Sequence, residues 1–299
     1  MTSTDTTVDG TAAVDFLAGH ARLLDRRRAG LFLGTSTPQE ALAALAGYRN
    51  PDGGYGWGLE PDLRSGSSQP GAALHAFEVF AEIGPATSPD AAALCDWLAS
   101  VSLPDGGLPF ALPVPDPAGT ATWWTQGAAQ DGSSLQITAI VAACAHATAR
   151  HDPAVAAHPW LARATAYCVE AARNVAAADE PPHALVLAFA LRLLDAAGET
   201  AVLERLGRFV PADGIVPVEG GTAAEAIRPL DIAPVPDRPV RALFRTEQID
   251  AELRRLAAGQ QADGGWRVEY AVFSPAGALE WRGHATVRAL QVLRANGRL

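Results

Sequence analysis

The sequence predicts an all-α fold made of repeated helical hairpins, and three observations lead to this prediction. Turns containing Asp-Gly or Asp-Gly-Gly recur near multiples of about 53 residues, which is typical of one supersecondary unit repeated along a chain. Two apolar stretches at helical spacing lie between successive turns. Stretches with a polar face alternate with stretches that are apolar all round, as two layers of helices require. We therefore expect about five or six hairpins in an α/α toroid, with long loops at one end.

The predicted turns share a residue pattern that specifies their conformation. The four copies are Pro51-Asp52-Gly53-Gly54, Pro104-Asp105-Gly106-Gly107, Ala212-Asp213-Gly214 and Ala262-Asp263-Gly264-Gly265. Asp and Gly tolerate backbone angles that other residues avoid, so each copy indicates a tight turn rather than a slack loop. A further copy is expected near residue 159, where His158-Pro159-Trp160 stands instead.

Helical spacing of apolar residues accounts for most of the chain. The stretches expected in an outer, amphipathic layer are 11–31, 41–46, 89–101, 161–177, 199–209 and 246–258. The stretches expected in an inner, apolar layer are 71–83, 133–149, 183–197 and 284–293. Within the first outer stretch, Asp25-Arg26-Arg27-Arg28 is interpreted as a solvated helix end. His75, in the first inner stretch, is interpreted as a core histidine.

Several segments lack this spacing. Residues 102–132 are rich in proline and are predicted to form a long loop. The adjacent Trp123 and Trp124 in this loop argue against disorder. Residues 211–241 are Pro/Gly-rich and irregular, and residues 207–241 have room for one irregular hairpin. A short β-hairpin is expected between 268–273 and 279–281.

The repeat runs along the chain without a linker. Residues 11–299 are therefore expected to form a single domain. The preceding segment, 1–10, is polar and is predicted to be disordered. This segment has no apolar core of a signal peptide, and no charge-free apolar run reaches the ~18 residues of a membrane span. A cytoplasmic protein without an integral membrane span is expected.

Composition and charge argue against some classes of partner. The net charge of −10 argues against nucleic acid and against anionic membrane surfaces. A small-molecule substrate, apolar in character, is the expected partner. The three cysteines are odd in number and have no CxxC spacing, so they are interpreted as reduced core thiols: Cys95, Cys144 and Cys168.

Residues 256–266, with the sequence LAAGQQADGGW, resemble the glutamine–tryptophan repeat (QW motif) of squalene–hopene cyclases and other terpenoid cyclases. Residues 48–57 and 98–110 resemble degenerate copies of this repeat. The resemblance implies the α/α toroid that these enzymes share with protein prenyltransferase β subunits. In that motif the Gln, Gly and Trp tie the end of one helix to the next turn, which implies structural roles for Gln260, Gly264 and Trp266.

Two other segments are similar to those of a set of small bacterial toroid proteins. They are Gly58-Leu59-Glu60-Pro61-Asp62 and Pro229-Leu230-Asp231-Ile232-Ala233-Pro234. The sequence also departs from the better-known relatives, because it has no DxDD motif of class II cyclases, no Asp-x-Cys pair for prenyltransferase zinc and no Asp-rich magnesium motif. We therefore expect no metal site and no cofactor.

The loops that join outer to inner helices are expected to converge at the mouth of a central cavity, a common place for a ligand. These loops and the starts of the inner helices supply aromatic, basic and acidic side chains. Aromatic faces stabilise carbocations and also stack on sugars. The candidate substrate-binding residues are Tyr55, Trp57, Arg64, Trp123, Trp124, Asp231, Trp266, Arg267, Tyr270, Glu280, Trp281, Arg282 and His284.

The first hypothesis is a metal-independent, terpenoid cyclase-like enzyme, a lyase or isomerase, that acts on a small isoprenoid. A carboxyl group pressed against aromatic rings is desolvated and its pKa rises, so Asp62 or Glu60 is expected to donate the initiating proton. The candidate arginines for holding a diphosphate are Arg64, Arg267 and Arg282.

Two other hypotheses remain open. A carbohydrate-active toroid enzyme needs two carboxylates at a defined separation in an open polar cleft. A non-catalytic toroid that binds a small apolar ligand or a partner needs carboxylates that are neutralised by arginine. Structural roles also compete with functional ones at single residues, since Glu60 and Asp62 can pair with Arg64 or cap their loop. Trp57 and Trp266 can serve packing alone.

Overall fold

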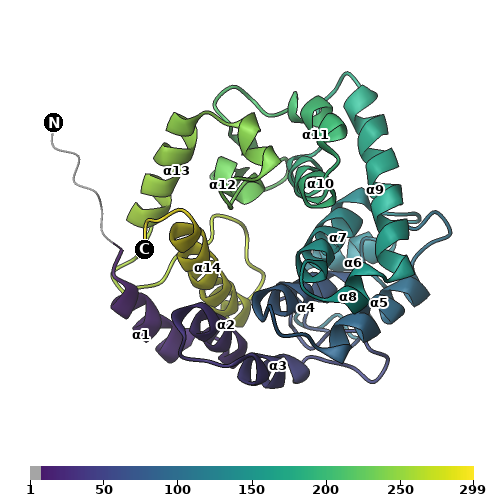
Figure 1. Cartoon of the computed structure of the whole chain (residues 1–299). Coiled ribbons are helices and arrows are strands. Elements are labelled where there is room, and N and C mark those ends of the chain that lie inside the picture. Colours follow the sequence, from purple (N-terminus) through teal and green to yellow (C-terminus); the bar gives the residue numbers. More distant parts are fainter. Residues whose placement is uncertain (1–7) are drawn as a thin grey trace. The chain divides into compact units, whose positions relative to one another are not determined.

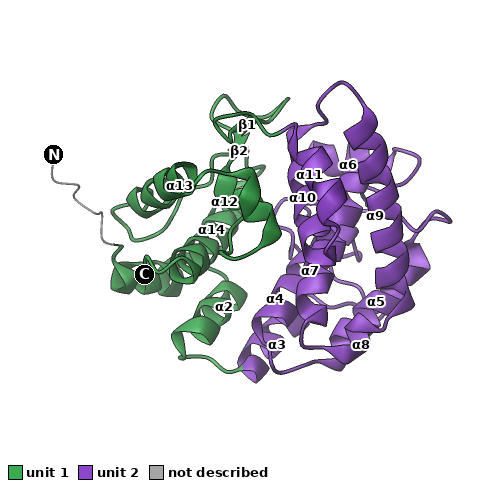
Figure 2. Ribbon diagram, turned by 45° about the horizontal axis from the view of Figure 1, so that its top comes forward, with its two compact units in different colours: residues 1–37, 210–299 green, residues 38–209 purple. Residues whose placement is uncertain are grey.

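The computed structural model describes residues 8–299, which contain fourteen α-helices, one 3-10 helix and two short strands (Figure 1). The prediction of a mostly helical, all-α chain is confirmed. Contacts divide the chain into two compact units (Figure 2). Unit 1 combines the N-terminal segment up to Thr37 with Val210–Leu299, and unit 2 is the continuous segment Pro38–Phe209.

Unit 2 contains nine of the helices that the structure describes. They are α3 (Pro38–Ala46), α4 (Pro70–Glu82), α5 (Pro89–Val101), α6 (Thr122–Ala128), α7 (Leu135–Ala149), α8 (Pro153–Ala156), α9 (Pro159–Ala177), α10 (Ala184–Ala197) and α11 (Thr200–Gly207). Helix α7 packs between α4 and α10, and these three helices form one layer. Helices α3, α5, α9 and α11 pack against one side of this layer and form the second layer. Unit 2 therefore has two layers.

Burial within unit 2 follows the predicted alternation of helix types. In α7 the nine consecutive residues from Ile137 to Ala145 are all buried, so the helix has no polar face along this length. In α9 the buried residues are spaced along one face, from Trp160 through Ala164 and Cys168 to Ala172. A helix that is apolar all round needs neighbours on both sides, which explains the position of α7 between α4 and α10.

Unit 1 is assembled around its longest helix. Its elements are α1 (Gly10–His20), α2 (Leu23–Leu33), β1 (Val216–Pro217), β2 (Ala226–Ile227), α12 (Pro229–Ile232), a 3-10 helix (Pro239–Leu243), α13 (Thr246–Ala258) and α14 (Pro275–Ala295). Helix α14 packs against α1, α2 and α13. The two strands form an antiparallel pair in which Val216 lies opposite Ile227. None of the described helices is both long enough and apolar enough to cross a membrane.

The repeated turns have one local structure. The first glycines of three copies, Gly53, Gly106 and Gly264, have φ angles of +91°, +93° and +90°. In each copy the aspartate just before accepts a backbone hydrogen bond from the second glycine, at 2.9, 3.0 and 3.2 Å. A φ in this range is rare for residues with a Cβ, so the glycine is required by the turn. The predicted recurrence of tight turns is thus confirmed.

Each of these turns also lies against the next outer helix. A Cβ built on Gly53 would lie 3.1 Å from the carbonyl oxygen of Ala93 in α5, and one on Gly106 would lie 2.9 Å from that of Arg163 in α9. Because glycine has no Cβ, the backbone of the turn lies directly against the backbone of the helix. This contact, rather than the turn conformation alone, links one hairpin to the next.

In unit 1 the last turn meets the first helix. A Cβ on Gly264 would overlap the carbonyl oxygen of Ala12 in α1. The side chain of Gln260 accepts a hydrogen bond from the Asp9 backbone N–H at 2.9 Å and donates one to the Asp9 carbonyl oxygen at 2.8 Å. The buried indole N–H of Trp266 donates to the carbonyl oxygen of Leu256 at the end of α13, at 2.7 Å. These contacts match the structural roles implied for Gln260, Gly264 and Trp266.

Some segments differ from expectation. The stretch 11–31 is two helices, with a break at Ala21 and Arg22. Residues 102–132 contain α6, so Trp123 and Trp124 lie on a short helix. The expected β-hairpin of 268–273 with 279–281 is wrong, because α14 already begins at Pro275. Its start is set by Ser274, whose hydroxyl accepts a hydrogen bond from the Gly277 N–H at 3.0 Å.

The N-terminal segment and the cysteines complete the description. Residues 1–7 of the segment predicted to be disordered lie outside the described residues. Asp9 and Gly10, at its end, belong to the cap and first turn of α1. The three cysteines are buried and form no disulfide with one another, as predicted. Burial raises the pKa of Cys95 to about 12, so this thiol is inert at neutral pH.

Candidate functional site

The loop between the first Asp-Gly-Gly turn and α4 folds back onto itself. The Trp57 backbone N–H donates to the Ser65 carbonyl oxygen at 2.8 Å, and the Gln69 N–H donates to the Tyr55 carbonyl oxygen at 2.9 Å. Leu59 and Leu63 within this loop are buried and anchor it to the core. The result is that a loop residue near position 60 lies beside α4, although the helix begins only at Pro70.

Glu60 meets His75 of α4 at this point, and His75 also contacts Glu78 of the same helix. The Nε2 atom of His75 lies 3.0 Å from Glu60 Oε2, and its Nδ1 atom lies 3.1 Å from Glu78 Oε2. His75 and Glu78 are three residues apart and therefore share one face of the helix. The side chains of Glu60 and His75 are buried, whereas the Glu78 side chain is 18% exposed. His75 is thus a core histidine as predicted, and it bridges two carboxylates.

The protonation of this cluster follows from its charges. Burial by itself would lower the pKa of His75, but the carboxylates of Glu78 and Glu60 outweigh it and raise the pKa to about 9. The imidazole is therefore a cation at neutral pH and donates through both ring nitrogens. Glu60 takes His75 as its partner rather than Arg64, the partner considered from the sequence. We call Glu60, His75 and Glu78 the histidine–carboxylate cluster.

Asp62, the other predicted acid, adjoins this cluster. It is 3% exposed, and its backbone N–H lies 3.3 Å from Glu60 Oε1. The carbonyl oxygen of Asp62 accepts a hydrogen bond from the Ala121 N–H at 2.8 Å, which joins the loop to the start of α6. The structure therefore brings the two predicted acids, Glu60 and Asp62, together in a buried place.

The side chain of Arg64 lies beside two glycines, Gly58 and Gly119, which have no Cβ to obstruct it. A Cβ on Gly58 would lie 3.5 Å from the guanidinium carbon of Arg64, and one on Gly119 would lie 3.4 Å from its Cδ. Both glycines have positive φ angles. The predicted residue Arg64 thus lies in the same loop region as Asp62, with its side chain beside Gly58 and Gly119.

The predicted aromatic residues of unit 2 divide into buried and exposed ones. Tyr55 is 1% exposed and Trp124 is 7% exposed, and Trp124 packs against Phe110 with 5.2 Å between ring centroids. Trp123 is 40% exposed and Trp57 is 60% exposed. Trp57 has a φ of +58°, which is strained for a bulky residue, and its indole N–H donates to Asn50 Oδ1 at 2.7 Å. Among these four residues, Trp57 and Trp123 present large aromatic surface.

The predicted residues of unit 1 mostly make structural contacts. Trp266 is buried. Arg282 pairs with Asp263 of the last turn at 2.8 Å and lies over the Phe16 ring, 4.5 Å from its centroid. Asp231 accepts a hydrogen bond from the Arg228 N–H at 2.9 Å. Arg267 is exposed, and Glu280 is half-buried.

Three further predicted residues form a row of rings in unit 1. Tyr270 packs edge-to-face on Trp281 with centroids 5.3 Å apart, and Trp281 packs edge-to-face on His284 at 5.6 Å. His284 is 8% exposed. The prediction of His284 as a site residue placed it beside Arg282, but within unit 1 it meets an arginine of α2.

That arginine belongs to a buried charged cluster that the sequence analysis missed. Asp25 is 0% exposed and Arg28 is 3% exposed, so the interpretation of this segment as a solvated helix end is wrong for both. Arg22 donates two hydrogen bonds to Asp25, at 2.8 and 3.2 Å, and Arg28 Nη1 lies 3.8 Å from Asp25 Oδ1. The same Nη1 atom lies 3.0 Å from His284 Nδ1. We call Asp25, Arg28 and His284 the arginine–histidine cluster.

The spacing of the charged residues in the sequence is the feature that could have indicated this cluster. Arg22, Asp25 and Arg28 are three residues apart, which places them along one helix face. Burial would raise the pKa of Asp25, but Arg22 and Arg28 outweigh it and hold that pKa below its usual value. The carboxylate therefore stays ionised inside the unit.

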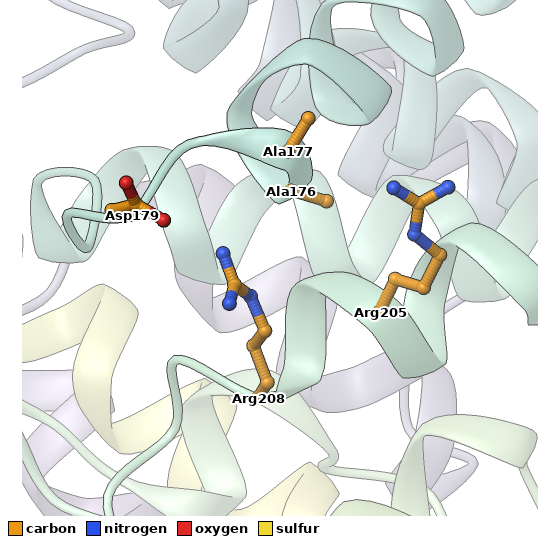
Figure 3. A pocket seen from close by; sticks show the side chains of 5 residues that line it. All are labelled: Ala176, Ala177, Asp179, Arg205 and Arg208. Atoms are coloured by element: carbon orange, nitrogen blue, oxygen red, sulfur yellow. The ribbon is translucent and has the colours of Figure 1, made fainter.

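A surface cavity of about 410 Å³ lies elsewhere in unit 2, between the end of α9 and α11 (Figure 3). Its lining residues are Ala176, Ala177, Asp179, Arg205 and Arg208. Arg208 donates to the carbonyl oxygen of Ala178 and thereby caps the end of α9. None of the sequence-predicted site residues lines this cavity, so we do not place the function there.

Comparison of the sequence with protein-family models and with curated proteins finds no match. The functional assignment therefore depends on the histidine–carboxylate cluster and on the resemblance of the repeats.

Proposed function

We propose that this chain is a terpenoid cyclase-like enzyme that uses buried acid–base groups at Glu60, Asp62 and His75 on a small isoprenoid. The observation that carries the proposal is the histidine–carboxylate cluster, in which a buried imidazolium donates to Glu60 and Glu78 at 3.0 and 3.1 Å. Groups with strongly perturbed pKa values concentrate at functional sites. The substrate class comes from the resemblance of the repeats.

The roles of the two acids follow from their partners. Glu60 accepts a hydrogen bond from His75, so it is engaged as a carboxylate. Asp62 lies beside it and is 3% exposed. We assign the initiating proton to Asp62 and the return of the proton to the Glu60–His75 pair. An imidazolium with a pKa of about 9 is too weak an acid to protonate an alkene, which is why the carboxyl group is needed.

We also propose that the hairpins close into an α/α toroid. The two-layer packing of unit 2 and the docking of each Asp-Gly-Gly turn on the next outer helix support this proposal. The contact of the last turn with α1 supplies the same junction for the end of the series. A single toroid domain and a cytoplasmic location belong to the proposal as well.

Product analysis by mass spectrometry tests the function. The purified protein is incubated with farnesyl diphosphate, geranylgeranyl diphosphate and squalene, beside the Asp62→Asn, Glu60→Gln and His75→Gln variants. A cyclised product is expected from the wild type, with a loss of at least about 100-fold in Asp62→Asn because the proton donor is removed. Asp96→Asn is the matched control, since its carboxylate is 80% exposed and pairs with His158 at the surface.

The controls make a negative result informative. Circular dichroism and urea unfolding show whether each variant is folded. A folded wild type that returns all three substrates unchanged would contradict the isoprenoid proposal. Equal activity in Asp62→Asn and Asp96→Asn would reject Asp62 as the acid.

A second candidate, a non-catalytic binding protein, is favoured by one specific observation. Other carboxylates among the predicted residues and their partners are already paired with arginine, as Asp263 is with Arg282 at 2.8 Å and Asp231 with Arg288 at 3.4 Å. Neutralised carboxylates suit ligand binding better than proton transfer. Unchanged substrate together with a ligand-induced rise in melting temperature would favour this candidate.

A further inference from the structure

Two buried polar atoms in segment 120–124 of unit 2 have no hydrogen-bond partner among the residues that the structure describes. They are the hydroxyl oxygen of Thr120 and the indole nitrogen of Trp124. Thr120 is 4% exposed and Trp124 is 7% exposed. Unpaired polar groups in buried places are unfavourable and rare. Two of them in one short segment therefore indicate a partner that the described part of the chain does not supply.

This segment packs on the loop that carries the predicted acids. The N–H of Ala121, which lies between Thr120 and Trp124 in the sequence, donates to the Asp62 carbonyl oxygen at 2.8 Å. The Trp124 ring lies against the first turn of α4, where a Cβ built on Gly71 would be 2.8 Å from Cη2 of the indole. Packing on α4 therefore fixes the indole, and the two unpaired atoms flank the junction with the Asp62 loop.

The two unpaired groups define the chemistry of their partner. An indole N–H can only donate and a hydroxyl can donate or accept, so an acceptor oxygen can satisfy both groups. A hydrocarbon can satisfy neither. The side chain of Arg64 brings a positive charge to the same region, since its Cδ lies 3.4 Å from the position of a Cβ on Gly119, the residue before Thr120. A guanidinium nearby favours an oxygen that carries negative charge, such as a phosphoryl oxygen.

We infer that Thr120 and Trp124 bind an acceptor oxygen in the head group of the substrate, beside Asp62. The inference rests on the proposed function and deepens it, because it selects isoprenoids that carry a phosphoryl or hydroxyl oxygen over pure hydrocarbons. Farnesyl diphosphate and geranylgeranyl diphosphate meet this requirement, and squalene does not. Thr120 and Trp124 are then specificity-determining residues, and the bound oxygen pairs two groups that are unpaired in the free protein.

Thermal melts of the ligand-free protein test whether the Thr120 hydroxyl is unpaired. Thr120→Val replaces this hydroxyl by a methyl group of similar size. The matched control is Thr138→Val, because the buried Thr138 hydroxyl accepts from the Leu108 N–H at 2.8 Å and donates to the Ser134 carbonyl oxygen at 2.6 Å. The melting temperature is expected to fall by several degrees in Thr138→Val and not to fall in Thr120→Val. Similar falls in both variants would show that the Thr120 hydroxyl already has a partner and would overturn the inference.

Isothermal titration calorimetry with farnesyl diphosphate, farnesol and squalene in the same detergent tests the ligand. The wild type is expected to bind farnesyl diphosphate most tightly, with a loss of affinity of about tenfold in Thr120→Val and in Trp124→Phe, because each variant loses one hydrogen bond to the ligand. The matched control is Trp160→Phe, which shortens another buried indole without a described N–H partner, one that stacks on Phe77. Its affinity is expected to be unchanged. Unchanged affinity in both test variants, or tighter binding of squalene than of farnesyl diphosphate, would overturn the inference.

The inference and the proposed reaction fail in different ways. Binding of farnesyl diphosphate that depends on Thr120 and Trp124, without any cyclised product, would contradict the reaction and support the inference. A cyclised product formed with an unchanged KM in Thr120→Val and Trp124→Phe would support the reaction and overturn the inference. A folded wild type that binds none of the three probes would contradict both.

Discussion

The two buried histidines with charged partners, His75 in unit 2 and His284 in unit 1, have opposite surroundings within their units. His75 lies between two carboxylates, at 3.0 and 3.1 Å, and its pKa is raised to about 9. The Nδ1 atom of His284 lies 3.0 Å from the guanidinium of Arg28. Their exposed fractions are similar, 4% and 8%. Within their units, the two rings therefore differ in the sign of the charge that they contact rather than in burial.

This difference separates the chemical roles of the two rings. A cationic histidine can stabilise carboxylates or release a proton, whereas a ring nitrogen that faces a guanidinium can only accept a hydrogen bond. Pairs of groups whose surroundings push their pKa values apart are typical of acid–base sites. The first tests therefore compare the two histidines by substitution.

The largest effect is expected from His75→Leu. This change leaves the buried Glu60 carboxylate without its imidazolium partner, and breaking a buried ion pair by removing one partner costs about 3–5 kcal/mol. Urea denaturation measures the loss in free energy of unfolding. The control Asp96→Asn removes the charge of the largely exposed partner in the pair of Asp96 with His158 and is expected to cost at most about 1 kcal/mol. Equal losses in the two variants would contradict a buried ion pair at His75.

The stability of the protein is expected to depend on pH because the pKa of His75 differs between the folded and the unfolded chain. Its pKa is about 9 in the folded chain against an ordinary value of 6.5 for an unfolded one, so the folded protein holds an extra proton between these values. Stability is then complete below about pH 6.5 and falls as the pH rises toward 9, by up to about 3 kcal/mol. Urea titrations at pH 6.5 and 9 measure the difference. A His75→Leu variant with the same loss would assign it to other groups.

Asp25→Asn is expected to have an intermediate effect in the arginine–histidine cluster. The substitution keeps the shape but removes the counter-charge that Asp25 supplies to Arg22 and Arg28, which we expect to cost about 2–3 kcal/mol. The wild type should also lose stability as the pH falls below about 4, because the pKa of Asp25 is lowered by folding. Thermal melts at pH 3 and 6 compare the two proteins. An acid-induced loss of unchanged size in Asp25→Asn would rule out this carboxylate as its source.

The smallest effect is expected from His284→Leu. The hydrogen bond between Arg28 and the ring is lost, and the guanidinium of Arg28 keeps Asp25 nearby, so a cost of about 1–2 kcal/mol is expected. The comparison with His75→Leu, measured by the same urea denaturation, sharpens the distinction between the two rings. A loss in His284→Leu that exceeds the loss in His75→Leu would contradict the larger contribution that we assign to His75.

The repeated parts of the fold could be predicted from the sequence alone. The Asp-Gly-Gly turns, the alternation of helix types and the structural role of Gln260 follow local rules of turn geometry and helical spacing. Glu60 and Asp62 were identified from their place after a turn. Their neighbour His75 was read only as a core residue, because nothing local shows that the loop folds back onto α4.

The arginine–histidine cluster was missed for a related reason. Asp25-Arg26-Arg27-Arg28 is locally indistinguishable from a charged helix end, and charged residues are rarely buried without partners. The histidine partner lies on α14, where Gly283 allows the close approach of α2. A spacing of three residues places Arg22, Asp25 and Arg28 on one face, but it does not show which face is covered. Long-range packing supplies that information.

The contact between the last Asp-Gly-Gly turn and α1 has a consequence for synthesis on the ribosome. Unit 2 is one continuous segment and emerges complete once residue 209 has left the exit tunnel. Helix α1 emerges first, yet the turn at Gly264 that covers it is made near the end of translation. Its apolar residues Phe16 and Leu17, buried in the finished protein, stay uncovered by that turn while most of the chain is synthesised. The packing surface around α1 is therefore completed only when the final hairpin is in place.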